Sequence, residues 1–138
     1  MPRILGLDVG DVRIGIAQSD LGRRIASPHS VYRRVGYGPD TEHFLRLAKE
    51  LDANLLVLGL PKNMDGTEGF QAHKVRDFAQ KLQEAGFEVA YVDERLTTVS
   101  AERTLLEGNV RRDRRREKID AVAAALILQQ YLDGRGKQ

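Results

Sequence analysis

Three acidic residues in separate segments of the chain have the types and positions expected of a metal-dependent hydrolase. Asp8 ends the first apolar run, Glu94 follows a later predicted strand, and Asp120 stands in the packing surface of the last predicted helix. A buried carboxylate loses hydration, so it persists where a cation or hydrogen bonds compensate it. Mg²⁺ and Mn²⁺ prefer such oxygen ligands, and two of these ions about 4 Å apart can activate water against a phosphodiester. The pattern predicts that Asp8, Glu94 and Asp120 are catalytic residues that bind Mg²⁺ or Mn²⁺.

Each of these carboxylates also has a structural interpretation. Asp8 can hydrogen-bond the turn that follows it, which is common for aspartate near turns. Glu94 can pair with Arg95 or Arg103, and this is the better interpretation if Glu94 is considered alone. Asp120 can favour the dipole of the helix that it enters. The joint placement of the three residues is what favours the functional interpretation.

Asp93 and Glu94 compete for one role at the end of their strand. Successive strand residues point to opposite faces of a sheet, but a strand end can twist or bulge, so alternation alone does not choose between them. Our hypothesis is that Glu94 contacts the metal and that Asp93 lies next to the ligands without contacting the metal itself.

Basic residues near these acids are candidates for phosphate contact. Segment 111–118 holds six basic and two acidic residues in a chain of net charge +2, so the remainder is slightly acidic. Such a local cluster suits a nucleic-acid backbone, and a solvated connector is the alternative. Arg13 lies beside Asp8 and can contact a phosphate or pair with Asp11. The predicted nucleic-acid-binding residues are Arg13, Lys62, Asn63, Arg111, Arg112, Arg114, Arg115, Arg116 and Lys118.

The composition predicts one globular domain over residues 1–138. The 138 residues are 41% hydrophobic and 30% charged, and they include no cysteine, which excludes disulfides and thiolate metal sites. No apolar run approaches the roughly 18 residues of a membrane span, so we expect a cytoplasmic protein with no membrane partner. With 6% aromatic residues and no tryptophan, a base-stacking platform is poorly supported.

Hydrophobic spacing predicts the elements that position the candidate site. Residues 3–9 and 12–19 are typical of strands joined by a tight turn at Gly10 and Asp11, and Pro28 places a third strand, 25–33, at an edge. The continuous apolar run 55–60 predicts a strand covered on both faces, and 87–93 predicts a fifth strand.

Four helices are predicted between and after the later strands. Asp40 can cap the first, whose inward positions are Phe44, Leu45, Leu47, Ala48 and Leu51. Thr67 can cap the second, which ends at Gly86 and turns Ala72, Val75, Ala79 and Leu82 inward. Thr98 can cap the third, which closes at Gly108 and Asn109, and the last helix runs from about 117 to 132.

These elements predict an α/β fold, with a three-strand meander followed by parallel crossovers in a mixed five-stranded sheet flanked by helices. The carboxyl ends of the parallel strands then meet at one rim, where ligands of α/β sheets bind. That rim would hold Asp8, the loop 61–63 and the pair Asp93 and Glu94. Lys62 and Asn63 precede the amino end of the helix at Thr67, which suits an anion, although an ordinary polar loop is also consistent.

Four ordered motifs resemble the YqgF family of RuvC-like Holliday junction resolvases, also described as pre-16S rRNA nucleases. The similarity runs from about Ile4 to Leu132. The motifs are Leu5-Gly6-Leu7-Asp8-Val9-Gly10 with Arg13-Ile14-Gly15, the segment 59–69 that begins Gly59-Leu60-Pro61-Lys62-Asn63, Asp93-Glu94-Arg95-Leu96-Thr97-Thr98, and Lys118-Ile119-Asp120-Ala121 followed by Val122-Ala123-Ala124.

The resemblance implies an RNase H-like fold and a cytoplasmic bacterial nuclease for the 5′ end of pre-16S rRNA in ribosome biogenesis. It also implies that Asp8, Glu94 and Asp120 form the metal-binding catalytic set. RuvC resolvases carry an acid after the fourth strand, where this chain has Gly59-Leu60-Pro61. Glu94 would have to replace that ligand, so cleavage of branched DNA is an alternative to cleavage of pre-rRNA.

Two further function classes stay open at this stage. A non-catalytic nucleic-acid-binding module would use the arginine cluster without metal-dependent turnover. An actin-like phosphotransferase also begins with an Asp-x-Gly hairpin, but such proteins need two lobes, for which 138 residues are too few. Symmetric cleavage of a junction would favour a homodimer with two sites.

Overall fold

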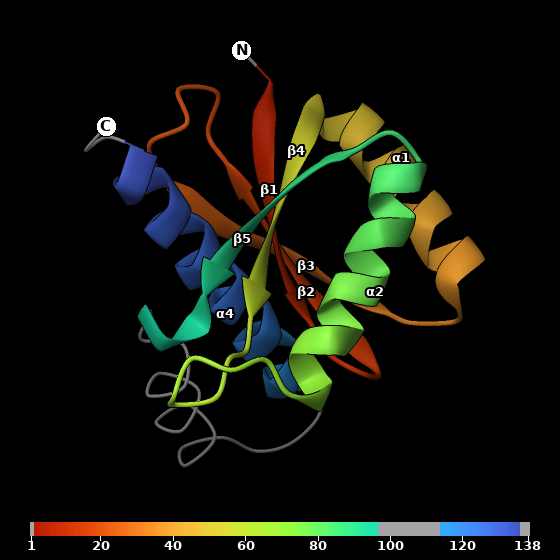
Figure 1. The fold of residues 1–138 in the computed structure, drawn as a ribbon. Helices are drawn as coiled ribbons and strands as arrows, with labels where there is room; N and C mark the ends of the chain where they lie inside the picture. The colour runs from red at the N-terminus through yellow and green to blue at the C-terminus, as the bar shows by residue number, and fades with distance from the viewer. Residues whose placement is uncertain (1, 97–113, 136–138) are drawn as a thin grey trace.

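The computed structural model describes residues 2–96 and 114–135 as a five-stranded mixed sheet with helices on both faces (Figure 1). The strand order across the sheet is β3-β2-β1-β4-β5. The strands are β1 (Arg3–Val9), β2 (Arg13–Ser19), β3 (Ala26–Arg33), β4 (Ala53–Leu60) and β5 (Glu88–Asp93). The predicted α/β architecture, with five strands in one mixed sheet, is therefore confirmed.

The first three strands form the predicted antiparallel meander. β1 pairs with β2 through a short turn, in which the N–H of Gly10 donates to the carbonyl of Arg13. β3 is an edge strand, and its pairing with β2 shifts register near Pro28. A proline has no N–H to donate to a ladder, so this edge position suits it.

The other pairings are parallel, as the crossovers predict. β4 pairs with β1 and β5 pairs with β4, so these three strands end at one rim of the sheet. β4 is central, and the residues from Leu56 to Leu60 are buried on both faces. The connections between them contain α1 (Tyr37–Leu51) and α2 (Phe70–Glu84).

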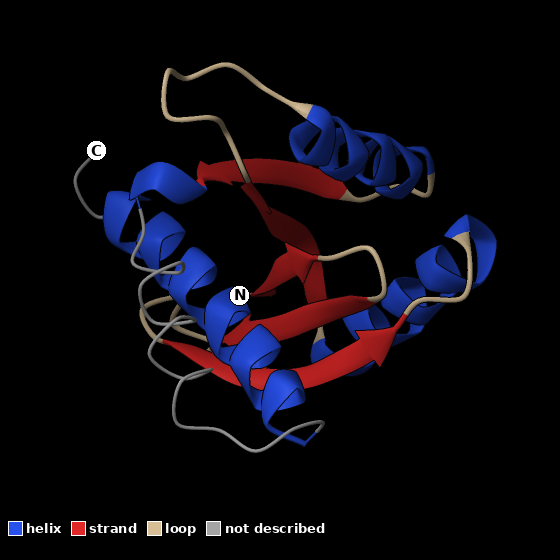
Figure 2. Cartoon of the chain, turned by 90° about the horizontal axis from the view of Figure 1, so that it is seen from below, coloured by secondary structure: helices blue, strands red, loops and turns tan. Residues whose placement is uncertain are grey.

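The helices divide between the two faces of the sheet (Figures 1 and 2). α1 and α2 cover one face, and α4 (Arg114–Arg135) crosses the other. Leu5 and Leu7 of β1 pack in the core under α1 and α2, whereas Ile4 packs in the core under α4 with Ile127 and Leu128. In the described part of the chain, no helix is long and apolar enough to cross a membrane.

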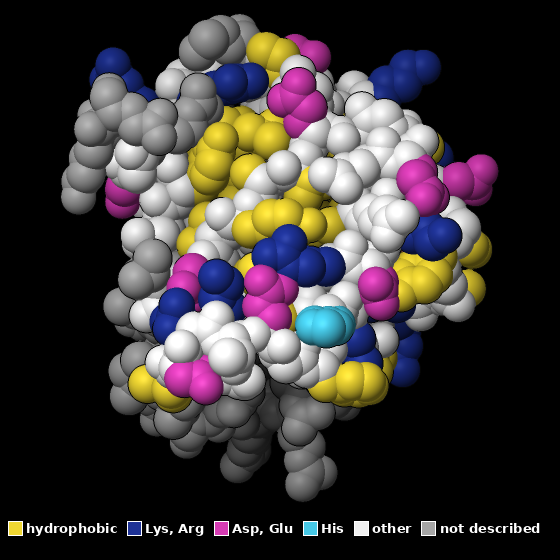
Figure 3. All heavy atoms as spheres, in the orientation of Figure 1, with side chains coloured by type: hydrophobic (Ala, Val, Ile, Leu, Met, Phe, Trp, Pro, Cys, Tyr) yellow, Lys and Arg dark blue, Asp and Glu magenta, His cyan; other side chains and the backbone are white. Residues whose placement is uncertain are grey.

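Apolar side chains also gather at the surface between α4 and β5 (Figure 3). Lys, Arg, Asp and Glu side chains gather instead near the carboxyl end of β5 and the start of α2. The surface beside β5 is thus apolar along the strand and becomes charged near the rim where the parallel strands end.

Both predicted caps on the described helices are wrong. α1 begins at Tyr37 after Gly36, so Asp40 lies inside its first turns, and α2 begins at Phe70 after Gly69 rather than at Thr67. Glycine occupies each capping position without a side-chain hydrogen bond, so the polar residue nearest the helix is a misleading signal here. Thr67 instead hydrogen-bonds the side chains of Asp65 and Asn63 within the preceding loop.

Other expectations differ in smaller ways. Leu45, which the spacing places among the inward residues, is an exposed residue of α1. Phe78, which the inward set of α2 omits, is fully buried, while Ala72, Val75, Ala79 and Leu82 are confirmed as buried. α4 begins earlier than predicted, at Arg114. The helix predicted from Thr98 to Gly108 and Asn109 lies outside the described residues.

Asp40 connects the start of α1 to the end of β3 through hydrogen bonds. Its buried carboxylate accepts hydrogen bonds from the Tyr32 hydroxyl, from Arg34 Nε, and from the N–H groups of Val35 and Gly36. Burial alone would raise the pKa of Asp40, but these donors outweigh it and hold the pKa below its ordinary value. The carboxylate therefore stabilises the fold while it is ionised.

We expect Asp40→Asn to lower the free energy of unfolding at about pH 7 by about 1–3 kcal/mol, because buried donors lose their charged acceptor. The lowered pKa means that this stabilisation is present above the unfolded-state pKa of about 3.9 and is lost as the pH falls through the folded-state pKa. Urea unfolding of both proteins at about pH 7 and about pH 2.5 measures the difference. Glu50→Gln, at an exposed site of α1, is the matched control. A variant as stable as the wild type at about pH 7 would contradict the prediction.

Candidate functional site

A cavity of about 470 Å³ lies at the rim where the parallel strands end. We call it the acidic pocket. It is lined by the β1–β2 hairpin (Asp8, Val9, Gly10, Asp11, Val12 and Arg13) and by Pro61, Gln71, Glu94 and Asp120. The structure thus brings together the three carboxylates singled out in the sequence, which come from β1, from the turn after β5, and from α4.

The three carboxylates share the face of the sheet that α4 covers. Ile4 of β1 packs against α4, and alternation carries Asp8 to the same face. Val92 of β5 also packs against α4, so Glu94, two residues later, follows it toward the pocket. Asp93 has the opposite parity, and its strand partner Leu60 packs under α1 and α2.

Asp93 forms its own contacts with Arg95. Arg95 donates to the Asp93 carboxylate from its backbone N–H and from Nε and Nη2, the last at 2.7 Å. These donors, above all the Arg95 side chain, hold the pKa of Asp93 below its ordinary value. Arg95 also donates to the carbonyl of Met64, so this pair ties the turn after β5 to the β4–α2 loop. Arg95, one of the two partners considered for Glu94, thus pairs with Asp93, and Arg103, the other, lies outside the described residues.

Glycines on the sheet create the room that the site needs. A Cβ placed on Gly15, which is the β2 partner of Asp8, would stand 2.0 Å from the backbone carbonyl oxygen of Asp120. A Cβ on Gly59 would stand 2.6 Å from Oε1 of Glu94 and 2.6 Å from Cδ1 of Ile127. Gly15 thus permits the approach of α4 at Asp120, and Gly59 leaves space for the Glu94 carboxylate.

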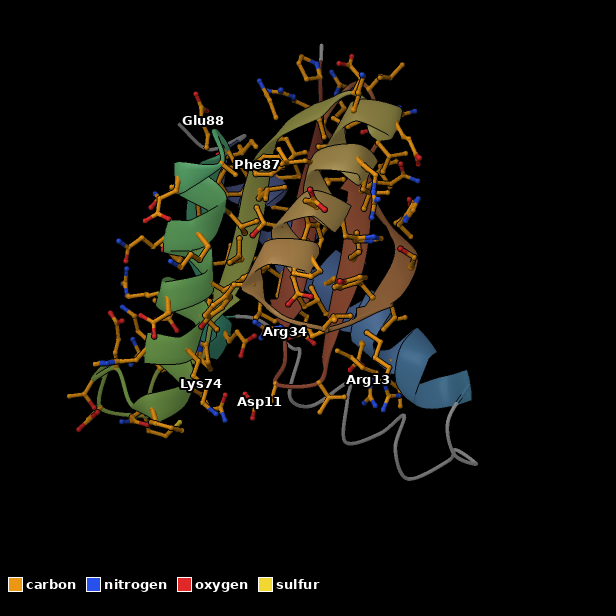
Figure 4. All side chains as sticks on the ribbon, turned by 90° about the vertical axis from the view of Figure 1, so that its right-hand side faces the viewer. Asp11, Arg13, Arg34, Lys74, Phe87 and Glu88 are labelled. Carbon is orange, nitrogen blue, oxygen red and sulfur yellow. The ribbon has the colours of Figure 1, made fainter. Side chains whose placement is uncertain are left out.

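Arg13 pairs with Asp120 across the pocket. Its Nε lies 2.8 Å from Oδ2 of Asp120, and the two side chains are 30% and 16% exposed. The alternative pairing of Arg13 with Asp11 is wrong, because Asp11 pairs with Lys74 of α2 at 3.1 Å. Figure 4 shows the hairpin between these contacts, with Lys74 pointing toward Asp11 on one side and Arg13 lying toward α4 on the other.

The remaining phosphate-contact candidates divide into two groups. Lys62 and Asn63 lie in the loop before α2, and neither lines the acidic pocket. Asn63 hydrogen-bonds Thr67, and the backbone of Lys62 forms an isolated antiparallel bridge with that of Glu68. Their contact with nucleic acid stays a prediction. Arg111 and Arg112 lie outside the described residues, as do the side chains of Arg114, Arg115, Arg116 and Lys118.

The sequence reasoning missed two residues of the pocket wall. Gln71 belongs to the first turn of α2, and Val12 belongs to the hairpin turn. A correct prediction that α2 begins at Phe70 would have indicated Gln71, because that start brings the first turn of the helix to the rim. Among the described residues, no group of three His, Asp or Glu side chains is already arranged closely enough to hold a metal ion.

A family model described as RuvX, Holliday junction resolvase, matches residues 2–134 of this chain. A protein of Clostridioides difficile (strain 630) named "Putative pre-16S rRNA nuclease" is 49% identical over 132 residues, which cover 95% of this chain and 94% of that protein. A protein of the same name from Lactococcus lactis subsp. lactis (strain IL1403) is 47% identical over 138 residues, covering 95% and 94%.

Solved structures resemble the fold at low sequence identity. RuvC of T. thermophilus in complex with a Holliday junction substrate matches with a TM-score of 0.60 and 15% identity, covering 100% of this chain and 98% of that one. The Fowlpox virus resolvase in complex with Holliday junction DNA matches with a TM-score of 0.53 and 12% identity, covering 96% and 98%. These likenesses confirm the RNase H-like fold that the sequence motifs predict.

If Gly15 sets the approach of α4, Gly15→Ala should lower the free energy of unfolding by about 1–3 kcal/mol or more, because the methyl group meets backbone rather than a movable side chain. Gly59→Ala should cost less, since Glu94 and Ile127 side chains can yield. Gly38→Ala, with nothing within 4 Å, is the control. Urea denaturation ranks the three variants, and equal stability of Gly15→Ala and Gly38→Ala would refute the close approach.

Proposed function

The chain belongs to the RuvX family of Holliday junction resolvases, and from this premise we propose that it is a metal-dependent nuclease. It would hydrolyse phosphodiester bonds of structured nucleic acid, with 5′-end processing of pre-16S rRNA in ribosome biogenesis as its task. Such a precursor is made in the bacterial cytoplasm, where we expect the protein to act. The observation that carries the proposal is the placement of Asp8, Glu94 and Asp120 around one pocket with Arg13.

The donor chemistry of the pocket suits Mg²⁺ or Mn²⁺. Asp8, Glu94 and Asp120 offer carboxylate oxygens, which these hard cations prefer, from three elements of the fold. A divalent metal bound by them would supply Lewis-acid stabilisation of the phosphodiester and a more acidic water. The chain itself contributes a pocket wall of backbone and apolar groups, and the Arg13 guanidinium, which can contact a phosphate oxygen.

Loading of the site would change the contact made by Arg13. One oxygen of Asp120 accepts from Arg13 Nε in the structure, so Arg13 competes with a metal for that carboxylate. If Asp120 held a metal, the Arg13 guanidinium would still lie in the same pocket and could contact a phosphate oxygen there. Arg13 would then exchange its contact with the Asp120 carboxylate for a contact with a substrate phosphate when metal and substrate are bound.

Branched DNA is the second candidate substrate. The family model carries the description Holliday junction resolvase, and the fold resembles resolvases solved with junctions. Symmetric cleavage of a junction would require a homodimer that presents two pockets. Measuring the mass of the protein in solution, with and without a four-way junction, separates this candidate from a monomeric RNA nuclease.

Asp8→Asn should abolish cleavage of pre-16S rRNA in Mg²⁺ or Mn²⁺. The expected loss exceeds the roughly 10- to 100-fold that removal of an outer-shell partner costs, because Asp8 would contact the metal directly. Asp77→Asn, an exposed acid of α2, is the control. Denaturing gels of a labelled precursor, run beside a four-way DNA junction, give both rates. Equal cleavage of both substrates by the wild type and Asp8→Asn would reject the proposal, and binding without cleavage by the wild type would favour a non-catalytic module.

Arg13→Ala should bind Mn²⁺ about two- to fivefold more tightly than the wild type, because partly exposed ion pairs contribute about 0.2–1 kcal/mol and a competitor is removed. It should at the same time bind nucleic acid more weakly, since a phosphate contact is lost. Calorimetric titration with Mn²⁺ measures the first effect and fluorescence anisotropy the second. Arg46→Ala, at an exposed position of α1, controls for the loss of one positive charge. Weaker Mn²⁺ binding by Arg13→Ala would contradict the exchange.

A further inference from the structure

A second cavity lies on the other side of the β1–β2 hairpin from α4. We call it the lateral pocket. Its volume is about 380 Å³, within the usual range for small-molecule sites. It is lined by Asp11, Arg34, Val35, Gly36, Tyr37, Asp40 and Lys74. Asp11 also lines the acidic pocket, so the two cavities adjoin at the tip of the hairpin.

The lateral pocket offers an aromatic surface at its edge. Tyr37 lines it and is 43% exposed, while its ring stacks on the buried Phe78 with the centroids 6.2 Å apart and the planes 15° apart. Arg34 also lies near this ring, with Cζ 5.8 Å from the centroid. Beside Tyr37, Val35 is 78% exposed. A supported ring next to an exposed apolar residue is a suitable surface for a nucleobase, because every base has a π face.

Lys74 is the available cation of this pocket. Its Nζ contacts Asp11 at 3.1 Å in an exposed pair, and it lies 4.4 Å from the ring centroid of Phe70, which is 75% exposed. An ammonium has three donors, and exposed ion pairs add little net stability, so a phosphate can take up this cation. In Figure 4 Lys74 reaches from α2 toward Asp11 at the hairpin tip, and Asp11 lines both pockets.

Arg34 has a different role in the same wall. It donates to the buried Asp40 carboxylate and to the carbonyl of Gly10, which is in the hairpin turn. Moving Arg34 to a ligand would leave Asp40 without its cation in a buried position, which is costly. Arg34 therefore holds the shape of the lateral pocket, and Lys74 supplies its free hydrogen-bonding capacity.

We propose that the lateral pocket binds one unpaired nucleotide of the strand whose phosphodiester occupies the acidic pocket. The base would stack on Tyr37, and a phosphate next to it would contact Lys74. The substrate class is then a single-stranded segment of nucleic acid, because a base inside a duplex has no open face for Tyr37. This inference rests on the proposed nuclease function for the placing of the neighbouring phosphodiester.

The stacking contact is tested by binding without cleavage. In buffer with a chelator, fluorescence anisotropy measures the affinity for a labelled single-stranded RNA. Tyr37→Ala should weaken binding about fivefold or more, as loss of a base-stacking residue does, and Tyr37→Phe should restore it. Leu45→Ala removes an equally exposed apolar side chain of α1, 43% exposed, and should bind as the wild type does. Thermal unfolding confirms that the variants are folded.

The phosphate contact is tested by the salt dependence of the same binding. For single strands the slope of log affinity against log salt is about −0.7 for each neutralised phosphate, so Lys74→Ala should reduce the magnitude of the slope by about 0.7. Lys81→Ala, elsewhere on α2, should leave the slope unchanged. Wild-type affinity and slope in both Tyr37→Ala and Lys74→Ala would overturn the inference. Equal losses on blunt duplex RNA would also overturn it, because the site would not then require an unpaired base.

Failure of the proposed nuclease function gives a different result. In one outcome the wild type binds single strands with an affinity that depends on Tyr37 and Lys74, yet cleaves no substrate in Mg²⁺ or Mn²⁺. That result supports the nucleotide site and rejects the nuclease function. A wild type that cleaves but shows no effect of either residue on binding supports the nuclease and rejects the lateral pocket.

Discussion

The close approach of α4 to the sheet is the constraint on which the candidate site depends. Where a Cβ at Gly15 would meet the backbone of Asp120, a Cβ at Gly6 would meet Cβ of Leu128 at 2.6 Å and the carbonyl oxygen of Ala124 at 2.8 Å. These glycines lie on adjacent strands and remove the side chains that would separate helix from sheet. Because α4 lies so near, Asp120 reaches the same pocket as Asp8.

The hairpin between β1 and β2 is braced from both sides of the molecule. Arg13 contacts Asp120 on α4, whereas Asp11 contacts Lys74 on α2, and Arg34 donates to Gly10 inside the turn. The turn therefore connects the layer above the sheet to the layer below it. Asp11 of this turn lines both cavities, so a ligand in either one would contact the same short segment of the chain.

Much of the architecture could be predicted because the strands that are buried appear in the sequence as apolar runs. The apolar runs located all five strands within about two residues, and the parity of each strand carries further information about which side chains share a face. Ile4 and Val92 lie on one face of the sheet, so Asp8 and Glu94 follow them to that face, and Asp93 does not. Alternation alone does not choose between Asp93 and Glu94, but once the structure shows that Val92 faces α4, counting by twos from Val92 places Glu94 on the side of the acidic pocket.

Other features could not be predicted because they depend on partners distant in sequence or on glycine. Arg13 and Asp120 are 107 positions apart, and local spacing offered Arg13 the nearer partner Asp11. The helices that begin at Tyr37 and Phe70 each follow a glycine. A glycine at the N-cap has no side chain that would mark the start of the helix in the sequence. The lateral pocket brings together Tyr37 of α1 and Lys74 of α2, and composition alone does not indicate that these two residues line one cavity.

Gly59 bears on the departure of this chain from the RuvC-like motif expected from the sequence, which has an acid after the fourth strand. The space in front of Gly59 is already filled, since a single added carbon would lie 2.6 Å from the Glu94 carboxylate. A longer acidic side chain at position 59 that took the same path would need the volume that Glu94 occupies. The Glu94 carboxylate, supplied from the turn after β5, therefore occupies the space in front of the end of β4 in this chain. In this chain the glycine on β4 and the glutamate after β5 are two parts of one arrangement: a longer side chain at position 59 would have to displace Glu94, and loss of Glu94 would leave the acidic pocket without one of its acids.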